Sequence, residues 1–299
     1  MCVWSVRELG KRRLIQILSA AACNGAVPNL FSGTVSASPL KRICVPGLNC
    51  HSCPAAVASC PAGSLQTFLA GGRFPFFTAG FLLLAGVLGG RAVCGFLCPF
   101  GFFQEILHKI AGKRKTRAAR RMRPAVPLHR LSSAARPVKY AVLLLFVLAL
   151  PLAMYIKNGY ASPYFCAYIC PAGTLGAGIP LVLADEALRA AAGFLFSWKV
   201  SLAVFFVLWS FFTFRPFCKY VCPLGALYGL FNRIAWFGIQ VDAEKCTGCG
   251  RCTAGCKMNA AAVNGLECIR CGECLSLCPE QALFVRGFRP ARSLRTKHT

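Results

Sequence analysis

Long apolar runs alternate with short basic segments along the first 240 residues. A membrane-spanning helix needs roughly 17–25 mostly apolar residues. Four windows approach this length, and the pattern predicts transmembrane helices near residues 14–31, 74–93, 138–156 and 194–214. A buried helix of a soluble protein is the alternative for each window. The first window contains Asn24 and Pro28, which interrupt its apolar character.

Two further segments, 43–72 and 158–184, carry no Lys, Arg, Asp or Glu but are interrupted by proline and glycine. Proline breaks a straight helix. Irregular backbone is tolerated at membrane depth only where it packs against protein. We therefore expect both segments to form re-entrant or interfacial loops.

The basic residues predict the orientation of the spans. Alternating four spans places 28 of the 34 Lys and Arg residues on one side and 6 on the other. Positive residues concentrate on the cytoplasmic side. We expect a multi-pass protein of the cytoplasmic (inner) membrane with both termini in the cytoplasm. The basic run at 113–123 is better explained by contact with anionic lipid of the bilayer than by nucleic-acid binding.

Composition supports a membrane protein rich in metal ligands. Only 14% of the residues are charged and 56% are hydrophobic, whereas soluble domains carry about 25% charge. The 20 cysteines follow CxxC and CxxxCP spacings, which favour metal ligation over a secreted disulfide scaffold.

The membrane region contains a repeat. A CPAG motif and then a CxxxCP motif occur in each half, each next to a predicted span, at Cys60 and Cys94–Pro99 in the first half and at Cys170 and Cys218–Pro223 in the second. The halves have the same topology, so we expect two parallel pseudo-repeats related by an axis along the membrane normal.

Residues 241–285 predict a separate two-cluster ferredoxin domain of the bacterial type, with an α+β fold. In this spacing the fourth cysteine of each run binds the other cluster. The first [4Fe–4S] ligand set is Cys246, Cys249, Cys252 and Cys278, and the second is Cys268, Cys271, Cys274 and Cys256. Zinc is the alternative. The chain thus divides into an α-helical membrane domain over 1–240, the ferredoxin domain over 241–285 and a basic tail over 286–299.

The membrane cysteines form an inner and an outer group. The inner group is Cys94, Cys98, Cys218 and Cys222, whose i,i+4 pairs share a helix face; the pseudo-symmetry predicts one shared iron–sulfur cluster, with inert thiols as the alternative. The outer candidates are Cys44, Cys50, Cys53, Cys60, Cys166 and Cys170. For these outer cysteines the sequence allows a further cluster, a thiol–disulfide pair or structural disulfides. His51 is more simply a loop residue than a ligand, and Cys2 and Cys23 belong to no motif.

Other cofactors are not indicated. No histidine lies in a predicted span and no CxxCH occurs, which excludes b-type and covalent c-type haem. No GxGxxG follows a strand, so no NAD site is visible. The absence of Asp and Glu from the spans argues against an ion pump. No substrate pocket is evident, so the sequence does not establish whether the chain is itself an enzyme.

The spans, the CxxxCP motifs at Cys94–Pro99 and Cys218–Pro223, and the C-terminal double ferredoxin resemble the NapH-like membrane polyferredoxins. The C-terminal region of the nitrous-oxide-reductase regulatory proteins is similar. The resemblance covers about residues 70–285. It implies electron transfer between a quinol pool or a cytoplasmic donor and a redox partner protein across the membrane. The outer cysteine motifs depart from this pattern. An accessory factor that reduces a metal or a disulfide of a partner enzyme is the alternative function.

Overall fold

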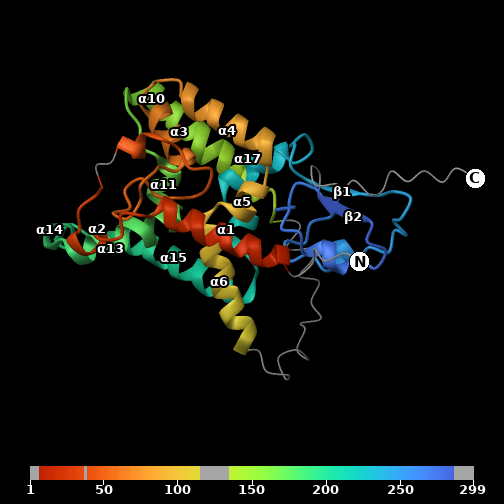
Figure 1. Ribbon diagram of the computed structural model, residues 1–299. Helices are drawn as coiled ribbons and strands as arrows, with labels where there is room; N and C mark the ends of the chain where they lie inside the picture. Colours follow the sequence, from red (N-terminus) through yellow and green to blue (C-terminus); the bar gives the residue numbers. More distant parts are fainter. Residues whose placement is uncertain (1–6, 37–38, 115–134, 286–299) are drawn as a thin grey trace, which may run out of the picture.

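The computed structural model describes residues 7–36, 39–114 and 135–285. Most of the basic run at 113–123, Cys2 and the basic tail at 286–299 lie outside the described residues. The described part is mostly helical, with one small sheet. A bundle of helices forms one end and the ferredoxin-type region, coloured blue, forms the other (Figure 1).

The helices of the first half precede residue 115. They are α1 (Arg7–Cys23), α2 (Asn29–Ser32), the 3-10 helix η1 (Pro39–Arg42), α3 (Pro61–Ala70), α4 (Phe76–Gly89), α5 (Ala92–Phe96) and α6 (Pro99–Arg114). The expected span over 14–31 is not one helix, because α1 ends at Cys23. The Asn24 side-chain amide donates to the Ala20 carbonyl there. Two polar side chains of α1, Arg12 and Gln16, are buried and pack against α5 and α6.

The second half contains the longer apolar helices. They are α9 (Val138–Val142), η2 (Leu143–Ala149), α10 (Leu150–Asn158), α11 (Tyr164–Tyr168), α12 (Pro171–Gly173), η3 (Thr174–Gly178), α13 (Ile179–Ala184), α14 (Glu186–Ala190), α15 (Phe194–Phe212), α16 (Pro216–Tyr220) and α17 (Pro223–Phe231). Both η2 and η3 are π-helical and end two residues before Pro151 and Pro180. A π-helical turn accommodates a residue that cannot donate the usual backbone hydrogen bond.

Two continuous helices in the described part of the chain are long and apolar enough to cross a membrane. They are Val138–Asn158, with 21 residues, and Phe194–Phe212, with 19 residues. The helix α4, in the second predicted span, has 14 residues. The segments expected to be re-entrant contain the short helices α3 and α11 to α13, separated by irregular backbone.

The C-terminal region is a small α+β unit. Strand β1 (Ile239–Val241) pairs antiparallel with β2 (Leu283–Val285), and Gln240 lies opposite Phe284. Between them lie α18 (Arg251–Ala254) and the 3-10 helix η4 (Glu273–Leu277). The pairing of its two ends closes this region around the eight cysteines.

The main hydrophobic core lies between the two halves of the bundle. It includes membrane cysteines from both halves together with large side chains such as Phe165, Phe217 and Tyr228. Many apolar side chains of α4 and α15 face outward instead, including Leu84 and Phe205. Outward-facing apolar side chains are what helices in contact with lipid present.

Candidate functional site

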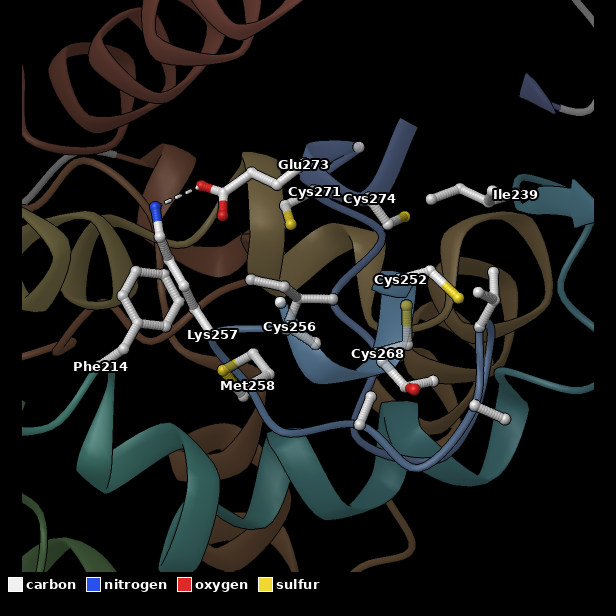
Figure 2. Close-up of a pocket in the computed structure, with 17 residues that line it drawn as sticks. Phe214, Ile239, Cys252, Cys256, Lys257, Met258, Cys268, Cys271, Glu273 and Cys274 are labelled. Atoms are coloured by element: carbon white, nitrogen blue, oxygen red, sulfur yellow. Dashed lines mark hydrogen bonds and ion pairs between the residues drawn. The ribbon is translucent and has the colours of Figure 1, made fainter. Parts of the chain in front are cut away.

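Each predicted ligand set of the ferredoxin region lines one cavity. Cys246, Cys249, Cys252 and Cys278 line a cavity of about 50 Å³. Cys256, Cys268, Cys271 and Cys274 line another of about 30 Å³, which Cys252 also borders. Figure 2 shows the second cavity, with Phe214 from the membrane domain at its edge and the ion pair between Lys257 and Glu273 beside it. Two soft thiolate quartets in apolar surroundings fit two iron–sulfur clusters.

The local backbone explains how these cysteines gather. Gly250 and Gly272 have φ values of +68° and +81°, a region that side chains with a Cβ rarely occupy. Each glycine starts the helical turn that carries the third cysteine of its run, Cys252 or Cys274. Burial and the neighbouring Glu273 raise the pKa of Cys271 to about 11. Ligation by this thiol therefore releases a proton at neutral pH.

The inner cysteines come together between the halves. Cys94 lies in α5 and Cys218 in α16, and all four thiols are buried within electrostatic range of one another. Pro99 and Pro223 are the first residues of α6 and α17, a position suited to proline. The N–H groups of Gly101 and Gly225 each donate to the thiol three residues earlier, at 3.4 Å.

No three His, Cys, Asp or Glu side chains in the described ranges converge closely enough to hold a single metal ion. Each thiolate of a [4Fe–4S] cluster binds a different iron, so its four ligands surround a larger group. The inner quartet supplies four buried thiols, two from each half of the chain.

Two arginines that the sequence analysis missed connect the halves. Arg91 and Arg215 each lie three residues before the first cysteine of a CxxxCP motif. Arg91 donates to the carbonyl of Cys218 at 3.0 Å, and Arg215 donates to the carbonyl of Cys94. A Cβ added at Gly101 would lie 2.8 Å from Arg215, and one at Gly225 would lie 3.3 Å from Arg91. The shared RxxCxxxCPxG spacing is the signal that reveals this reciprocal contact.

Each buried arginine has a carboxylate partner. Arg215 pairs with Glu105 at 2.8 Å, and Glu105 also pairs with Arg12 of α1. Arg91 pairs with Glu267 of the ferredoxin region at 2.6 Å, and Glu267 also pairs with Lys139. Burial raises the pKa of Glu267, but the charges of Arg91 and Lys139 outweigh it and hold that pKa below its usual value. Glu267 is therefore ionised and ties the ferredoxin region to both halves of the bundle.

The ferredoxin loop around Cys268 also docks on the membrane domain through its backbone. The Asn232 amide donates to the carbonyls of Gly265 and Cys268, both at 2.8 Å. Arg270 donates to the carbonyls of Asn232, Phe237 and, at 3.3 Å, Gly89. These contacts hold the loop at the ends of α4 and α17, and its Ile269 carbonyl lies against Gly95 of α5, the helix that carries Cys94.

Replacing Gly95 with alanine is expected to weaken this docking. A Cβ at Gly95 would overlap the Ile269 carbonyl, so the ferredoxin loop must shift. Overpacking of this kind costs about 1–3 kcal/mol. Thermal unfolding and limited proteolysis between the two regions measure the effect. Gly80→Ala is the matched control, because nothing lies within 4 Å of that Cβ; equal behaviour of the two variants would contradict the prediction.

The outer cysteines separate into two sets. Cys50, Cys60, Cys166 and Cys170 line a cavity of about 770 Å³. Cys53 instead packs with Ala55, Ala56 and Ala177, and Cys44 lies in a bridge opposite Ser59. The cysteines of the described residues are all free, Cys23 included. His51 contacts the Ser59 hydroxyl through Nδ1 at 2.7 Å.

Comparison with known proteins identifies iron–sulfur domains in the chain. A family model described as a 4Fe-4S binding domain (Fer4_5) matches residues 71–117, 140–181 and 194–240. A second model with the same description (Fer4_6) matches residues 239–261. These matches include the four inner cysteines, Cys166 and Cys170, but not Cys50 or Cys60. The chain therefore carries 4Fe–4S binding domains.

Several curated proteins are similar over about two thirds of the chain. The uncharacterized protein MJ0749 of Methanocaldococcus jannaschii is 29% identical over 66% of this chain and 64% of its own length. The regulatory protein NosR of Pseudomonas aeruginosa is 32% identical over 63% of this chain, and the match spans 23% of NosR. The putative electron transport protein YccM of Escherichia coli is 28% identical over 64% of this chain and 50% of its own length. No solved structure matches the chain significantly.

The predicted resemblance is confirmed at the level of 4Fe–4S binding domains and of similarity to NosR. Membership of the NapH-like group in particular stays a prediction.

Proposed function

We propose that this chain is a membrane-bound iron–sulfur electron carrier, which relays electrons between a cytoplasmic or quinol donor and an acceptor in the membrane or beyond it. The similarity to a putative electron transport protein supports this function. The observation that carries the proposal is that Arg91 links the backbone just before the second ferredoxin cysteine run to the backbone of an inner cysteine. Arg91 donates to the Leu266 carbonyl at 2.9 Å and to the Cys218 carbonyl at 3.0 Å. One side chain therefore joins both sites.

The bound clusters would supply one-electron redox chemistry. The chain's own residues hold and insulate the sites: the eight ferredoxin cysteines bind two clusters, and the inner quartet binds a third between the repeats. Arg91 and Arg215 place positive charge beside the inner thiolates, which stabilises a buried anionic site. Backbone N–H groups directed at the sulfurs tune the reduction potential.

The topology belongs to the same proposal. In this proposal the chain crosses the cytoplasmic membrane four times. The helices Val138–Asn158 and α15 are long and apolar enough for two of the crossings, and the shorter helices α1 and α4 belong to the other two. The ferredoxin domain and both termini lie on the cytoplasmic side, where the predicted basic connections lie. Its partners are the lipid bilayer and one redox protein on each side, or a quinol in place of one of them.

Iron and sulfide analysis after anaerobic purification tests the function. We expect more than eight irons per chain, because each [4Fe–4S] cluster adds about four to the roughly eight of the ferredoxin domain. Cross-ligation predicts that Cys278→Ser removes the first ferredoxin cluster and Cys256→Ser the second, as seen by electron paramagnetic resonance of the reduced protein. Two or fewer irons with zinc present would refute the proposal.

A further inference from the structure

The outer cavity has the features of a second four-cysteine site. Its lining includes Cys50, Cys60, Cys166 and Cys170, two from each half of the chain. The thiol of Cys166 lies within electrostatic range of the other three. A Cβ added at Gly173 would lie 3.6 Å from the sulfur of Cys50, and one at Gly63 would lie 3.6 Å from the sulfur of Cys166. The four sulfurs therefore gather across the interface of the repeats, as the inner four do.

One glutamine at each site makes the same contacts. Gln104 lies six residues after Cys98; it donates to the sulfur of Cys218 at 3.2 Å and accepts from the N–H of Phe217 at 3.2 Å. Gln66 lies six residues after Cys60; it donates to the sulfur of Cys166 at 3.5 Å and accepts from the N–H of Phe165 at 2.9 Å. Both side chains are buried.

This correspondence pairs Cys60 with Cys98 and Cys166 with Cys218. The third pair is Cys170 with Cys222, because each is the second cysteine of a CxxxCP motif in the second half of the chain. Cys50 then takes the place of Cys94. The outer site thus repeats three of the four ligand positions of the inner site, and its fourth ligand, Cys50, does not come from a CxxxCP motif.

Backbone donors surround the outer sulfurs as well. The backbone N–H groups of Gly63 and Gly173 lie close enough to the sulfurs of Cys60 and Cys170 to favour their charged forms, at positions that correspond to Gly101 and Gly225 of the inner site. The backbone N–H of Ser52 lies close enough to the Cys50 sulfur to favour its charged form, and the N–H of Cys53 donates to the Cys50 carbonyl at 3.1 Å. Such donors stabilise thiolate sulfur that carries negative charge.

We propose that Cys50, Cys60, Cys166 and Cys170 bind a further [4Fe–4S] cluster, because their arrangement repeats that of the four inner cysteines. The proposal excludes Cys44 and Cys53, whose sulfurs do not line the cavity. Lys41, Arg42 and Lys199 do line it, and their positive charges would offset the net negative charge of a cluster with four thiolates. The role of this cluster in electron transfer rests on the proposed electron-carrier function, but the assignment of its four ligands does not.

The two membrane sites are close neighbours. Phe165 precedes the outer Cys166 and Phe217 precedes the inner Cys218; their ring centroids are 6.4 Å apart. The outer loop also reaches the inner site, because a Cβ added at Gly47 would lie 2.7 Å from the Cα of Cys98. Buried Tyr228 lies within electrostatic range of Cys60 and Cys94. An electron would therefore travel only a short distance between the two sites.

The test compares iron content and paramagnetic resonance of single variants of the full-length protein, purified anaerobically in detergent. We expect Cys60→Ser and Cys166→Ser each to lose about four irons and one spectral signal, while the inner and ferredoxin signals persist. Cys44→Ser and Cys53→Ser are the matched controls and should keep all the iron. Full iron content in both ligand variants would overturn the proposal. So would rapid labelling of Cys60 and Cys166 by a thiol reagent in the untreated protein, which would indicate a redox-active thiol pair.

A second pair of variants decides the matter if the serine variants fail to fold. Gln66→Leu removes a donor to the outer sulfur, and Gln104→Leu removes its inner counterpart. Losing such a donor lowers the potential of the cluster it contacts. We therefore expect each variant to shift a different signal in a redox titration. A shift with Gln104→Leu alone would refute the outer cluster but leave the proposed function intact. No shift with either variant would refute clusters at both membrane sites.

Discussion

Replacing Glu267 with glutamine is expected to destabilise the attachment of the ferredoxin domain to the membrane domain. Glu267 is the carboxylate partner of both Arg91 and Lys139, whose side chains are 0% exposed. Glutamine keeps the shape but leaves two like charges buried without a counter-charge. Removing one partner of a buried ion pair costs about 3–5 kcal/mol. The change in thermal unfolding, followed by ferredoxin absorbance, measures the loss.

Glu244→Gln is the matched control, since Glu244 lies in the same domain and is exposed. That variant should unfold like the unmodified protein. The double variant Glu267→Gln, Lys139→Met should recover part of the lost stability, because only one buried cation remains. An unchanged unfolding midpoint for Glu267→Gln would show that this carboxylate does not hold the two regions together.

Replacing Cys98 with serine is expected to interrupt electron transfer through the membrane domain while the ferredoxin clusters stay reducible. A site with three thiolates binds a cluster more weakly than one with four. The variant should lose about four irons and the inner signal. Reduction of the ferredoxin domain by dithionite should remain unchanged. Rapid-mixing absorbance and paramagnetic resonance follow both steps in the same sample.

Cys23→Ser provides the comparison for this experiment. Cys23 is buried like Cys98 but belongs to no motif, so its replacement should leave the iron content unchanged. Retention of all the iron in Cys98→Ser would show that the inner cysteines are plain thiols. The ferredoxin domain would then be the remaining secure redox unit of the chain.

Local spacing predicts the ferredoxin ligand sets. Cysteines with two residues between them converge because the intervening glycines permit the required turns, and the structure places each predicted set around its own cavity. The apolar windows predicted the helices Val138–Asn158 and Phe194–Phe212 for the same reason: their hydropathy is a property of contiguous residues. The window over 14–31 does not form one continuous helix, because hydropathy does not show that Asn24 ends a helix or that Arg12 is buried against Glu105.

The sequence by itself determined the chemistry of this protein: many thiols, few acids, apolar helices and a cysteine repeat in each half. Only the tertiary structure decided how these parts combine. It placed Arg91 across the repeats onto Cys218 and beside Glu267, and it selected Cys50 rather than Cys53 for the outer cavity. Contacts between residues 100 or more positions apart depend on how the helices pack, and no local pattern along the chain encodes that packing.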